Sequence, residues 1–505
     1  MGFLSKHWKQ LCLVGVLLLC QILITLPRLD LPFIDGRLHW FYDNANFTRM
    51  AVHSNDDTIK SPLKIFGLAS YGYHEDGTIH TLNHYPDHPV LPTTLFKMYT
   101  SIVGYHDWVP RTYTLFLSLM ITIVLFQLIY TVSGRLWVSA GLTLLYILLP
   151  LNFMYQDVFK HEVMVTLCVL LTFYFMTAIP KGVVYRRMFL VSLFFLFHSG
   201  WGAYVPALFM VIYLFFKRKD PQFGTVVWWA LGVSMTSIII NFSVMYMLGF
   251  TPETIQRITK DRMSKGLDVV THMGWLKKQL GFFSMNFMTV NAVCMGIMAL
   301  VLVAFIPVSF NYLTFLGWVM IVSASLWIGV FRNLSFIHHY SQWYFGLAYV
   351  GILGGIATSL KDKVTSKSFM KGFGVIICGL CIMTFIGANQ LRSSFLGGYM
   401  GTAEDIEVIR NLNRRLVIFS NGASGQKVWW NSVSFSLYAD PVYKSWKSGR
   451  ALNETQGGRI FIDKLDMIDP NRDVVVILNR QDAFNYAIQK LKEKYDIKDL
   501  QLVDK

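Results

Sequence analysis

Acidic residues are scarce in this sequence, and so are cysteines. The chain of 505 residues has 30 Asp and Glu against 45 Lys and Arg, a formal net charge of +15. All six cysteines fall inside apolar segments, so neither a disulfide framework nor a thiolate metal site is predicted. No soluble basic domain is present, and the charge therefore favours anionic lipids or phosphates as partners over nucleic acid. Nucleotide-binding glycine fingerprints are also missing, which argues against cytoplasmic nucleotide substrates.

Long apolar runs are what the chain does have. Hydrophobic residues make up 54% of it, and the mean hydropathy is +0.43. Several runs are long enough to cross a hydrocarbon core of about 30 Å. The sequence therefore predicts a polytopic α-helical membrane protein with about eleven transmembrane helices. The expected spans are 11–26, 112–132, 136–153, 162–179, 187–199, 202–217, 225–248, 287–306, 310–331, 340–358 and 372–390.

Basic residues set the expected orientation of these spans. Lys6 and Lys9 precede the first span, which places the N-terminus in the cytoplasm by the positive-inside rule. Residues 187–217 then form a hairpin with cytoplasmic ends, and His198–Gly202 forms its outer tip. We expect the segments 180–186, 217–224 and 359–371 inside, and the segments 28–110, 249–286 and 391–505 outside.

The composition changes near Leu391, which divides the chain into two predicted domains, 1–390 and 391–505. Short β-like runs at 416–419, 459–462 and 474–478 are separated by turn residues. Helical patterns at 403–416 and 482–494 flank these runs. We therefore predict a small α/β domain of about 110 residues at the C-terminal end, large enough for a modest core.

The first outer loop, about residues 28–110, gathers carboxylates and histidines on an otherwise apolar protein. Polar chemistry is expected there, on the extracytoplasmic face. Two motifs stand out within it: Tyr42–Ala51 (YDNANFTRMA) and Asn83–Leu91 (NHYPDHPVL).

These motifs resemble those of the membrane glycosyltransferases of the GT-C fold, the group of protein O-mannosyltransferases and lipid A aminoarabinose transferases. Asp43 falls on the family's loop aspartate, with Asn44 in place of the neighbouring acid. Asp87-His88-Pro89-Val90-Leu91 falls on its second motif, with Val90 in place of a proline, and Arg111 fits at the start of the second span.

Two later segments extend the resemblance, which covers residues 1 to about 390. Tyr155–Glu162 (YQDVFKHE) matches a short outer loop that ends in an acid; Glu162 is the better positional match and Asp157 the second. Arg332–Tyr344 resembles the family's Arg…His-x-Tyr-Tyr segment before a late span. The resemblance thus implies Asp43, Glu162 and Asp157 as catalytic residues.

The function implied is sugar transfer outside the cytoplasm, from a polyprenyl phosphate donor to a lipid, polysaccharide or protein acceptor. An acceptor hydroxyl needs a base such as Asp43, and direct displacement inverts the anomeric centre. The leaving phosphate needs cations or a metal. The candidates for the donor phosphate are Arg262, Lys277, Lys278 and Arg332; those for substrate binding are Asp87, His88, His338 and Tyr340; and those for a divalent metal are Asp87, His88 and His338.

A bacterial or archaeal host is favoured, with the protein most simply in a bacterial inner membrane acting on lipopolysaccharide, O-antigen or another envelope glycan. Asn46-Phe47-Thr48 is an N-glycosylation pattern three residues from Asp43, and a glycan there would obstruct the site.

Simpler interpretations stand beside these. Asp43 fits a helix cap, Asp87 before His88-Pro89 fits a turn, and Lys277-Lys278 fits a contact with lipid headgroups. A transporter or lipid-linked sugar flippase would also need many spans, but it predicts acids in mid-span, whereas these acids cluster in outer loops. An O-antigen ligase would place its large loop later, and an oligosaccharyltransferase would carry a larger soluble domain.

Overall fold

The computed structural model describes most of the N-terminal three quarters of the chain. The residues described are 2–29, 42–55, 67–73, 79–84, 88–249, 251–254, 256, 269–305, 311–363, 367–396, 415–419, 459–462 and 473–477. Their contacts divide the chain into two compact units. The first is formed by Met1–Pro27, Pro86–Pro92 and Thr114–Arg392, and the second by Arg28–Tyr85, Thr93–Tyr113 and Ser393–Lys505.

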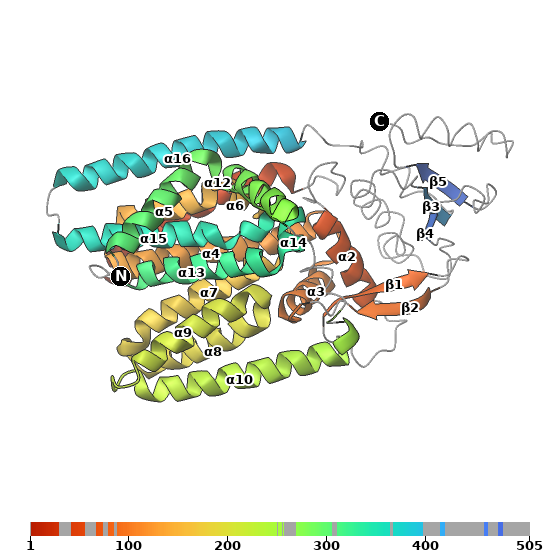
Figure 1. The fold of residues 1–505 in the computed structure, drawn as a ribbon, viewed down its shortest axis with the longest axis horizontal. Coiled ribbons are helices and arrows are strands. Elements are labelled where there is room, and N and C mark those ends of the chain that lie inside the picture. The colour runs from red at the N-terminus through yellow and green to blue at the C-terminus, as the bar shows by residue number, and fades with distance from the viewer. Residues whose placement is uncertain are drawn as a thin grey trace. The chain divides into compact units, whose positions relative to one another are not determined.

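The first unit is helical (Figure 1). Its α-helices are α1 (Gly2–Thr25), α4 (Val109–Ser133, which begins in the second unit), α5 (Leu136–Leu148), α6 (Pro150–Tyr155), α7 (His161–Ala178), α8 (Val183–Ser199), α9 (Tyr204–Phe216), α10 (Gly224–Met247), α12 (Val269–Phe305), α13 (Tyr312–Val330), α14 (Arg332–Ile337), α15 (Tyr344–Lys363) and α16 (Lys367–Leu396). Short 3-10 turns are η1 (Leu26–Arg28, at the junction of the units), η3 (Ile179–Lys181), η4 (Trp201–Ala203) and η6 (His339–Gln342).

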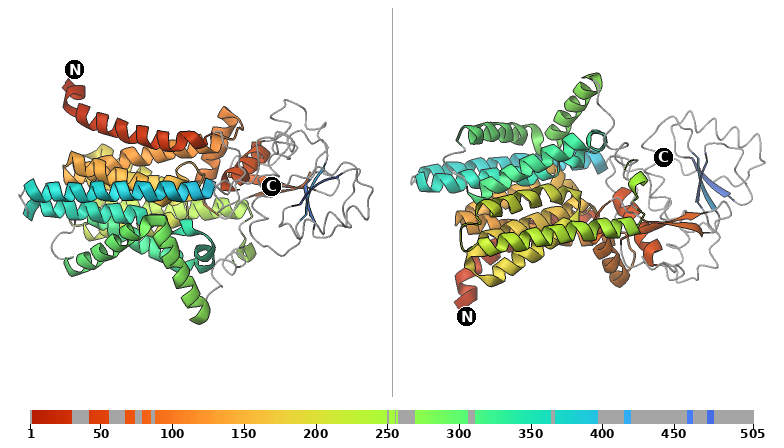
Figure 2. Two further views of the ribbon diagram at one scale, coloured as in Figure 1. Left: turned by 90° about the horizontal axis from the view of Figure 1, so that it is seen from above. Right: turned by 60° about the horizontal axis from the view of Figure 1, so that its bottom comes forward.

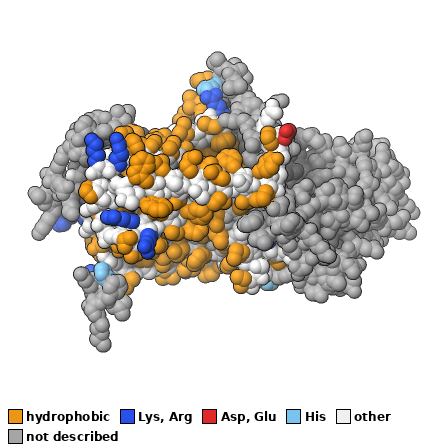
Figure 3. Space-filling view, turned by 90° about the horizontal axis from the view of Figure 1, so that it is seen from below, with side chains coloured by type: hydrophobic (Ala, Val, Ile, Leu, Met, Phe, Trp, Pro, Cys, Tyr) orange, Lys and Arg blue, Asp and Glu red, His pale blue; other side chains and the backbone are white. Residues whose placement is uncertain are grey.

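Each of the eleven predicted spans contains helical residues. Among the described residues, six helices are long and apolar enough to cross a membrane: His7–Arg28, Val109–Ser133, His161–Lys181, Gly224–Met247, Tyr312–Val330 and Lys371–Ser393. Leu136–Leu148 and Trp201–Phe216 are shorter apolar helices. Hydrophobic side chains cover much of the described surface in Figure 3, as expected where lipid is the solvent. The membrane fold is confirmed at this level, and the number of eleven spans stays a prediction.

Helices far apart in the sequence pack through apolar clusters. Leu17 of α1, Phe126 of α4, and Ala140 and Ile147 of α5 form one buried cluster. This cluster holds α1 along one side of the helical unit, next to α4 and α5 (Figure 2).

Helices α13 and α15 approach so closely that their glycines are required. A Cβ atom on Gly351 would lie 2.9 Å from the backbone nitrogen of Gly317, and one on Gly317 would lie 2.9 Å from the nitrogen of Ile352. Gly355, four residues after Gly351, packs against Thr314 in the same way. Small residues spaced by four let backbones approach, which replaces the hydrophobic driving force that lipid does not supply.

Helix α12 changes direction at Met288, which has φ +62° and ψ 144° within the helix. Its first part, before Met288, is helical, whereas the sequence predicted a loop there; the placement of residues 249–286 outside the membrane stays a prediction. The break lies one residue after position 287, where the sequence predicted that a span begins. Met288 packs against Gly387 of α16, and a side chain at Gly387 would collide with it.

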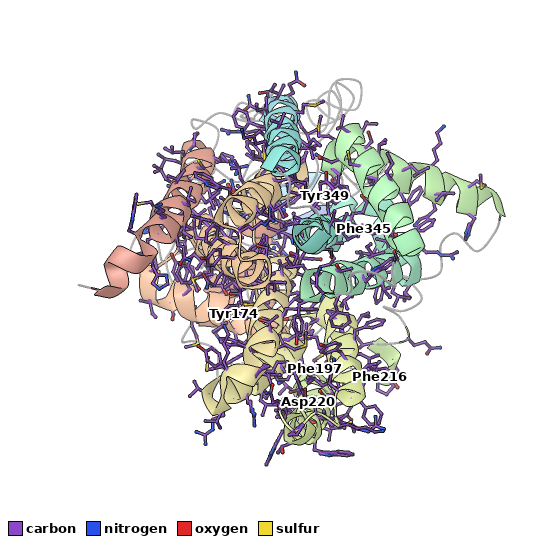
Figure 4. The ribbon with its side chains drawn as sticks, turned by 90° about the vertical axis from the view of Figure 1, so that its left-hand side faces the viewer. Tyr174, Phe197, Phe216, Asp220, Phe345 and Tyr349 are labelled. Carbon is purple, nitrogen blue, oxygen red and sulfur yellow. The ribbon has the colours of Figure 1, made fainter. Side chains whose placement is uncertain are left out.

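Tyr349 and Phe345 of α15 contact α12 on either side of this break (Figure 4). The Tyr349 hydroxyl donates to Oδ1 of Asn291 at 3.1 Å, and Nδ2 of Asn291 donates to Oγ1 of Thr384 at 2.8 Å. Phe345 packs edge-on against Phe283, with ring centroids 5.0 Å apart. These contacts fasten α12, α15 and α16 to one another in the apolar part of the unit.

The second unit shows that the predicted first loop is partly regular. It contains α2 (Tyr42–Asn55), an antiparallel hairpin of β1 (Ala69–Tyr73) and β2 (Ile79–His84), and most of α3 (Leu91–Val103). Asn55 at the end of α2 hydrogen-bonds the Tyr105 hydroxyl. Arg111 is fully buried and donates to the Leu29 carbonyl at 2.8 Å.

Three strands at the C-terminal end match the β-like runs of the sequence. β3 (Arg415–Phe419) lies between β4 (Arg459–Ile462) and β5 (Asp473–Ile477), and all three are parallel. The helical patterns predicted at 403–416 and 482–494 lie outside the described residues, apart from the two that begin β3. The C-terminal α/β domain and the boundary at 391 therefore remain predictions.

Candidate functional site

The turn between α6 and α7 concentrates polar side chains in a buried place. Pro150 starts α6, which ends at Tyr155, and Lys160 caps α7 in an extended conformation (φ −141°, ψ 141°) without a side-chain capping bond. All the polar side chains of this turn are at most 9% exposed: Tyr155, Gln156, Asp157, Lys160, His161 and Glu162. Burial of ionisable groups is costly unless they are paired or used, so the turn is the strongest candidate site.

The turn is joined to η6 through Tyr155 and His339. The Tyr155 hydroxyl lies 3.0 Å from Nε2 of His339. Burial, and secondly the nearby positive charge of Lys160, lower the pKa of His339 to about 3. His339 is therefore a neutral imidazole at physiological pH, and it forms one hydrogen bond with the Tyr155 hydroxyl.

Lys160 is held by aromatic rings. Its Nζ lies 3.5 Å from the ring centroid of Tyr340 and 5.6 Å from that of Tyr155. An ammonium over a ring face is attracted by the ring quadrupole, and more strongly when it is desolvated. Tyr340 therefore fixes a buried cation at the beginning of α7.

Three amide side chains hold η6 against the first part of α12. Nδ2 of Asn286 donates to the His339 carbonyl at 2.7 Å and to Oε1 of Gln342 at 3.1 Å. Nε2 of Gln342 donates to the backbone and side-chain oxygens of Gln279 at 2.9 and 3.0 Å. Gln279 in turn donates to the Ser335 carbonyl at 2.6 Å. This chain of bonds leaves His339 little freedom to shift.

His88 comes to the same turn from the second predicted motif. Its ring stacks on that of His161, with centroids 4.4 Å apart and planes at 19°. The segment Pro86–Pro92 belongs to the same compact unit as α7. The structure thus brings together three segments that the sequence had singled out separately: residue 88, residues 155–162 and residues 338–340.

The tip of the predicted hairpin packs on the start of α7. Its position between α8 and α9 is as expected, with η4 at the turn. A Cβ atom on Gly200 would lie 2.8 Å from Cγ2 of Val165, and one on Gly202 would collide with the Tyr344 ring. The glycines therefore allow the tip to lie close to His161 and Val165 of α7 and to Tyr344 of α15.

The predicted phosphate-binding cations differ in their surroundings. Lys277 is exposed, whereas Lys278 is half-buried with its Nζ 4.2 Å from the ring centroid of Phe336. Arg332 is half-buried; its Nη1 lies 3.0 Å from Nδ1 of His272, and its guanidinium lies 5.6 Å from the Trp275 ring centroid. Lys278 also lies 5.6 Å from the ring of Phe282, which packs against His339 at 5.9 Å. One aromatic ring, that of Phe282, therefore separates Lys278 from His339 of η6.

The side chains of three predicted site residues lie outside the described part of the chain. Asp43 lies in the first turn of α2 and not in an irregular loop, but its side chain lies outside the described residues, as do Asp87 and Arg262. Within the described part of the chain, no three His, Cys, Asp or Glu side chains converge as metal ligands. Of the metal candidates, His88 stacks on His161, and the ring of His338 is tilted at 31° against that of Tyr340, with centroids 4.9 Å apart.

Several residues at this site were not predicted from the sequence. Tyr155, Gln156 and Lys160 lie inside the Tyr155–Glu162 segment, where only the two acids drew attention. A lysine two residues before the start of an apolar span, with an acid at that start, was the available indication. Gln279, Asn286 and Gln342 offered none, because single amides in a membrane helix have no distinguishing pattern.

Two crystal structures of ArnT from Cupriavidus metallidurans are similar to this chain. The one bound to undecaprenyl phosphate has 11% sequence identity, covers 97% of this chain and 89% of its own, and has a TM-score of 0.45. The apo structure has 12% identity, the same coverage and a TM-score of 0.44.

No protein-family model matches the chain, and no curated protein sequence matches it. Because both TM-scores lie below 0.5, the proposals below rest on the residues of this chain.

Proposed function

We propose that this protein is an integral membrane glycosyltransferase that takes a sugar from a polyprenyl phosphate donor. The observation that carries the proposal is the buried turn at the start of α7, where Asp157 and Glu162 lie within five residues of each other and Lys160 lies between them. Acids and a cation buried together are expected where a charged substrate reacts. A flippase or transporter is less well supported, because this charge lies at the beginning of a helix and not in mid-span.

The cations are assigned to the donor's phosphate. Lys160 is buried at the turn, and Lys278 and Arg332 lie beside aromatic rings on elements that contact η6 or precede it. Charge-assisted hydrogen bonds from such groups stabilise a phosphodiester and, more strongly, the phosphate monoester dianion that leaves. Lys277 and Arg262 remain candidates from the sequence for the same role.

The reaction is a single displacement at the anomeric carbon. The acceptor oxygen forms a bond to that carbon as the bond to the phosphate oxygen breaks, and polyprenyl phosphate leaves with the electron pair. A carboxylate takes up the proton of the attacking hydroxyl, and we assign this role to Asp43. Asp157 and Glu162 are assigned as further catalytic residues. This path inverts the anomeric configuration. His88, His338, Tyr340 and Asp87 are assigned to substrate binding.

The site is assigned to the extracytoplasmic face, in a bacterial inner membrane with an envelope glycan or lipid as acceptor. The support is the distribution of basic residues: Lys181, Arg186, Arg187 and Lys217–Lys219 flank the other ends of α7–α10. Cytoplasmic nucleotide sugars are absent from that outer face, so a lipid-linked donor is the natural one.

Purified protein in detergent micelles tests the proposal directly. Lipids are extracted from a deletion strain, in which the unused donor accumulates, and are mixed with envelope glycans and lipids from the same strain. Mass spectrometry should show the loss of a lipid-linked sugar and a matching gain on one acceptor. A micelle has no two leaflets between which a lipid could be moved, so a flippase would produce no change in the mass spectra. Absence of transfer, with donor present and protein folded, contradicts a transferase.

A further inference from the structure

Gln156, in the α6–α7 turn, has a buried side-chain amide with no hydrogen-bond partner among the described residues. The residue is 3% exposed. Neither Oε1 nor Nε2 has a hydrogen-bond partner among the residues that the structure describes. Buried amides normally satisfy at least one of these groups, because leaving both unpaired destabilises the folded protein.

The backbone of Gln156 is, by contrast, fully engaged. Its N–H donates to the Asn152 carbonyl at 3.0 Å, and its carbonyl accepts from the Ser118 hydroxyl at 3.1 Å. It ends α6 in ordinary helical geometry (φ −64°, ψ −11°). The amide is therefore presented from a fixed position, between Tyr155 and the fully buried Asp157.

The chemistry of the unused groups selects the ligand. An amide offers a donor at Nε2 and an acceptor at Oε1. A phosphate has only acceptor oxygens, so it would satisfy Nε2 and repel Oε1. A cation would do the reverse. A hydroxyl both donates and accepts, and a sugar presents several of them.

From this, and resting on the proposed function, we infer that Gln156 binds a hydroxyl of the transferred sugar and helps to select which sugar the enzyme accepts. Cations such as Lys160 then bind the phosphate of the donor, and the neutral amide of Gln156 binds its sugar. A polar site that is complete only when a hydroxyl occupies it discriminates strongly against an analogue without that hydroxyl.

The test uses the full-length protein and a donor series. The series consists of synthetic undecaprenyl phosphate carrying the sugar that the wild-type protein transfers, together with its monodeoxy derivatives. Gln156→Met keeps the approximate size and removes both hydrogen-bonding groups. Gln222→Met, in the exposed turn before α10, is the matched control. For wild type and control, removal of one particular hydroxyl should lower kcat/KM by about 10- to 100-fold.

For Gln156→Met, removal of the same hydroxyl from the donor should change kcat/KM less than about threefold, because the protein group that binds that hydroxyl is already absent. Binding of undecaprenyl phosphate without a sugar should be unchanged. If the deoxy profiles of wild type and Gln156→Met are the same, Gln156 holds only water and the inference is overturned. If Gln156→Met does not fold, Gln156→Ala, which also removes both hydrogen-bonding groups, decides by the same comparison. A wild-type protein that transfers no sugar would instead overturn the proposed function.

Discussion

The Tyr155 hydroxyl lies 3.0 Å from Nε2 of His339, although 184 residues separate the two in the chain. This bond joins the turn before α7 to η6 before α15. Lys160, over the Tyr340 ring, makes a second link between the same two segments. The candidate site is therefore held by two contacts that cross it, and each can be removed by a single substitution.

Stability should fall as the pH is lowered from about 6.5 to about 3, in part because of His339. Burial and Lys160 hold its pKa near 3 in the folded protein, against an ordinary value of 6.5. Below 6.5 the unfolded chain therefore binds a proton that the folded protein does not, and folding loses free energy until the folded pKa is reached. The measurement is the melting temperature in detergent across this range.

His339→Gln should flatten this pH dependence, because glutamine does not titrate. His106→Gln, at an exposed position, is the control and should leave the wild-type curve unchanged. An equally steep curve for His339→Gln would assign the acid sensitivity to other groups.

Asp43→Asn should abolish transfer and leave the protein folded in the membrane. A general base loses its proton acceptor when it is converted to an amide, and such roles are typically worth about 100- to 10,000-fold in rate. The readout is kcat in micelles beside the melting temperature. Glu162→Gln and Asp157→Asn should also lower kcat, by smaller factors. Near-normal turnover by Asp43→Asn would eliminate Asp43 as the base.

Neutralising Lys277 and Lys278 together should raise the apparent donor KM more than the acceptor KM. Charge-assisted contacts to phosphate are worth about 1.5–3 kcal/mol, which corresponds to roughly tenfold to a hundredfold in affinity. Lys278, half-buried over Phe336, should account for most of the effect, and exposed Lys277 for little. Binding of free undecaprenyl phosphate should weaken in parallel.

The control for this pair is the double variant Lys181→Met, Lys219→Met, which removes two exposed cations near the other ends of the helices. If donor and acceptor parameters are unchanged in the Lys277, Lys278 variant as well, these lysines contact only headgroups. The phosphate site then lies around Arg332, His338 and Lys160.

Much of the helical unit could be predicted from the sequence, because apolar length is a local property. Each of the six described helices that are long and apolar enough to cross a membrane overlaps a predicted span for that reason. The helix before the break at Met288 was missed, since His272 and Lys277-Lys278 make Val269–Phe287 too polar to be a span. Regular structure in the first outer loop was missed as well, because α2 and β1–β2 carry no strong periodicity.

The candidate site could be predicted only in part, and the missing part depends on tertiary contacts. His88, Glu162 and Tyr340 were selected by short motifs, and the structure brings their segments together. The neutral state of His339 and the unused amide of Gln156 depend on burial, which no local pattern reveals.

Gly351→Val should destabilise the packing of α13 on α15. A Cβ atom there would lie 2.9 Å from the Gly317 nitrogen and 3.2 Å from the Leu313 carbonyl oxygen, so backbone would have to move. Overpacking of this kind typically costs about 1–3 kcal/mol, and the melting temperature should fall. Gly379→Val in α16, where nothing lies within 4 Å of the added Cβ, is the control. Equal melting temperatures for the two variants would contradict the close approach.

The assignment of faces predicts opposite labelling for two cysteines introduced into a cysteine-free variant. Asp43→Cys lies in the segment predicted outside, and Lys219→Cys lies at an exposed position between α9 and α10, in the segment predicted inside. A charged maleimide that does not cross membranes should label Asp43→Cys in intact cells and Lys219→Cys only after permeabilisation. The physical reason is the excess of Lys and Arg at the second position, which the membrane potential and anionic lipids retain in the cytoplasm. The reverse pattern would place the turn at Lys160 on the cytoplasmic side, and a donor presented outside would no longer reach it.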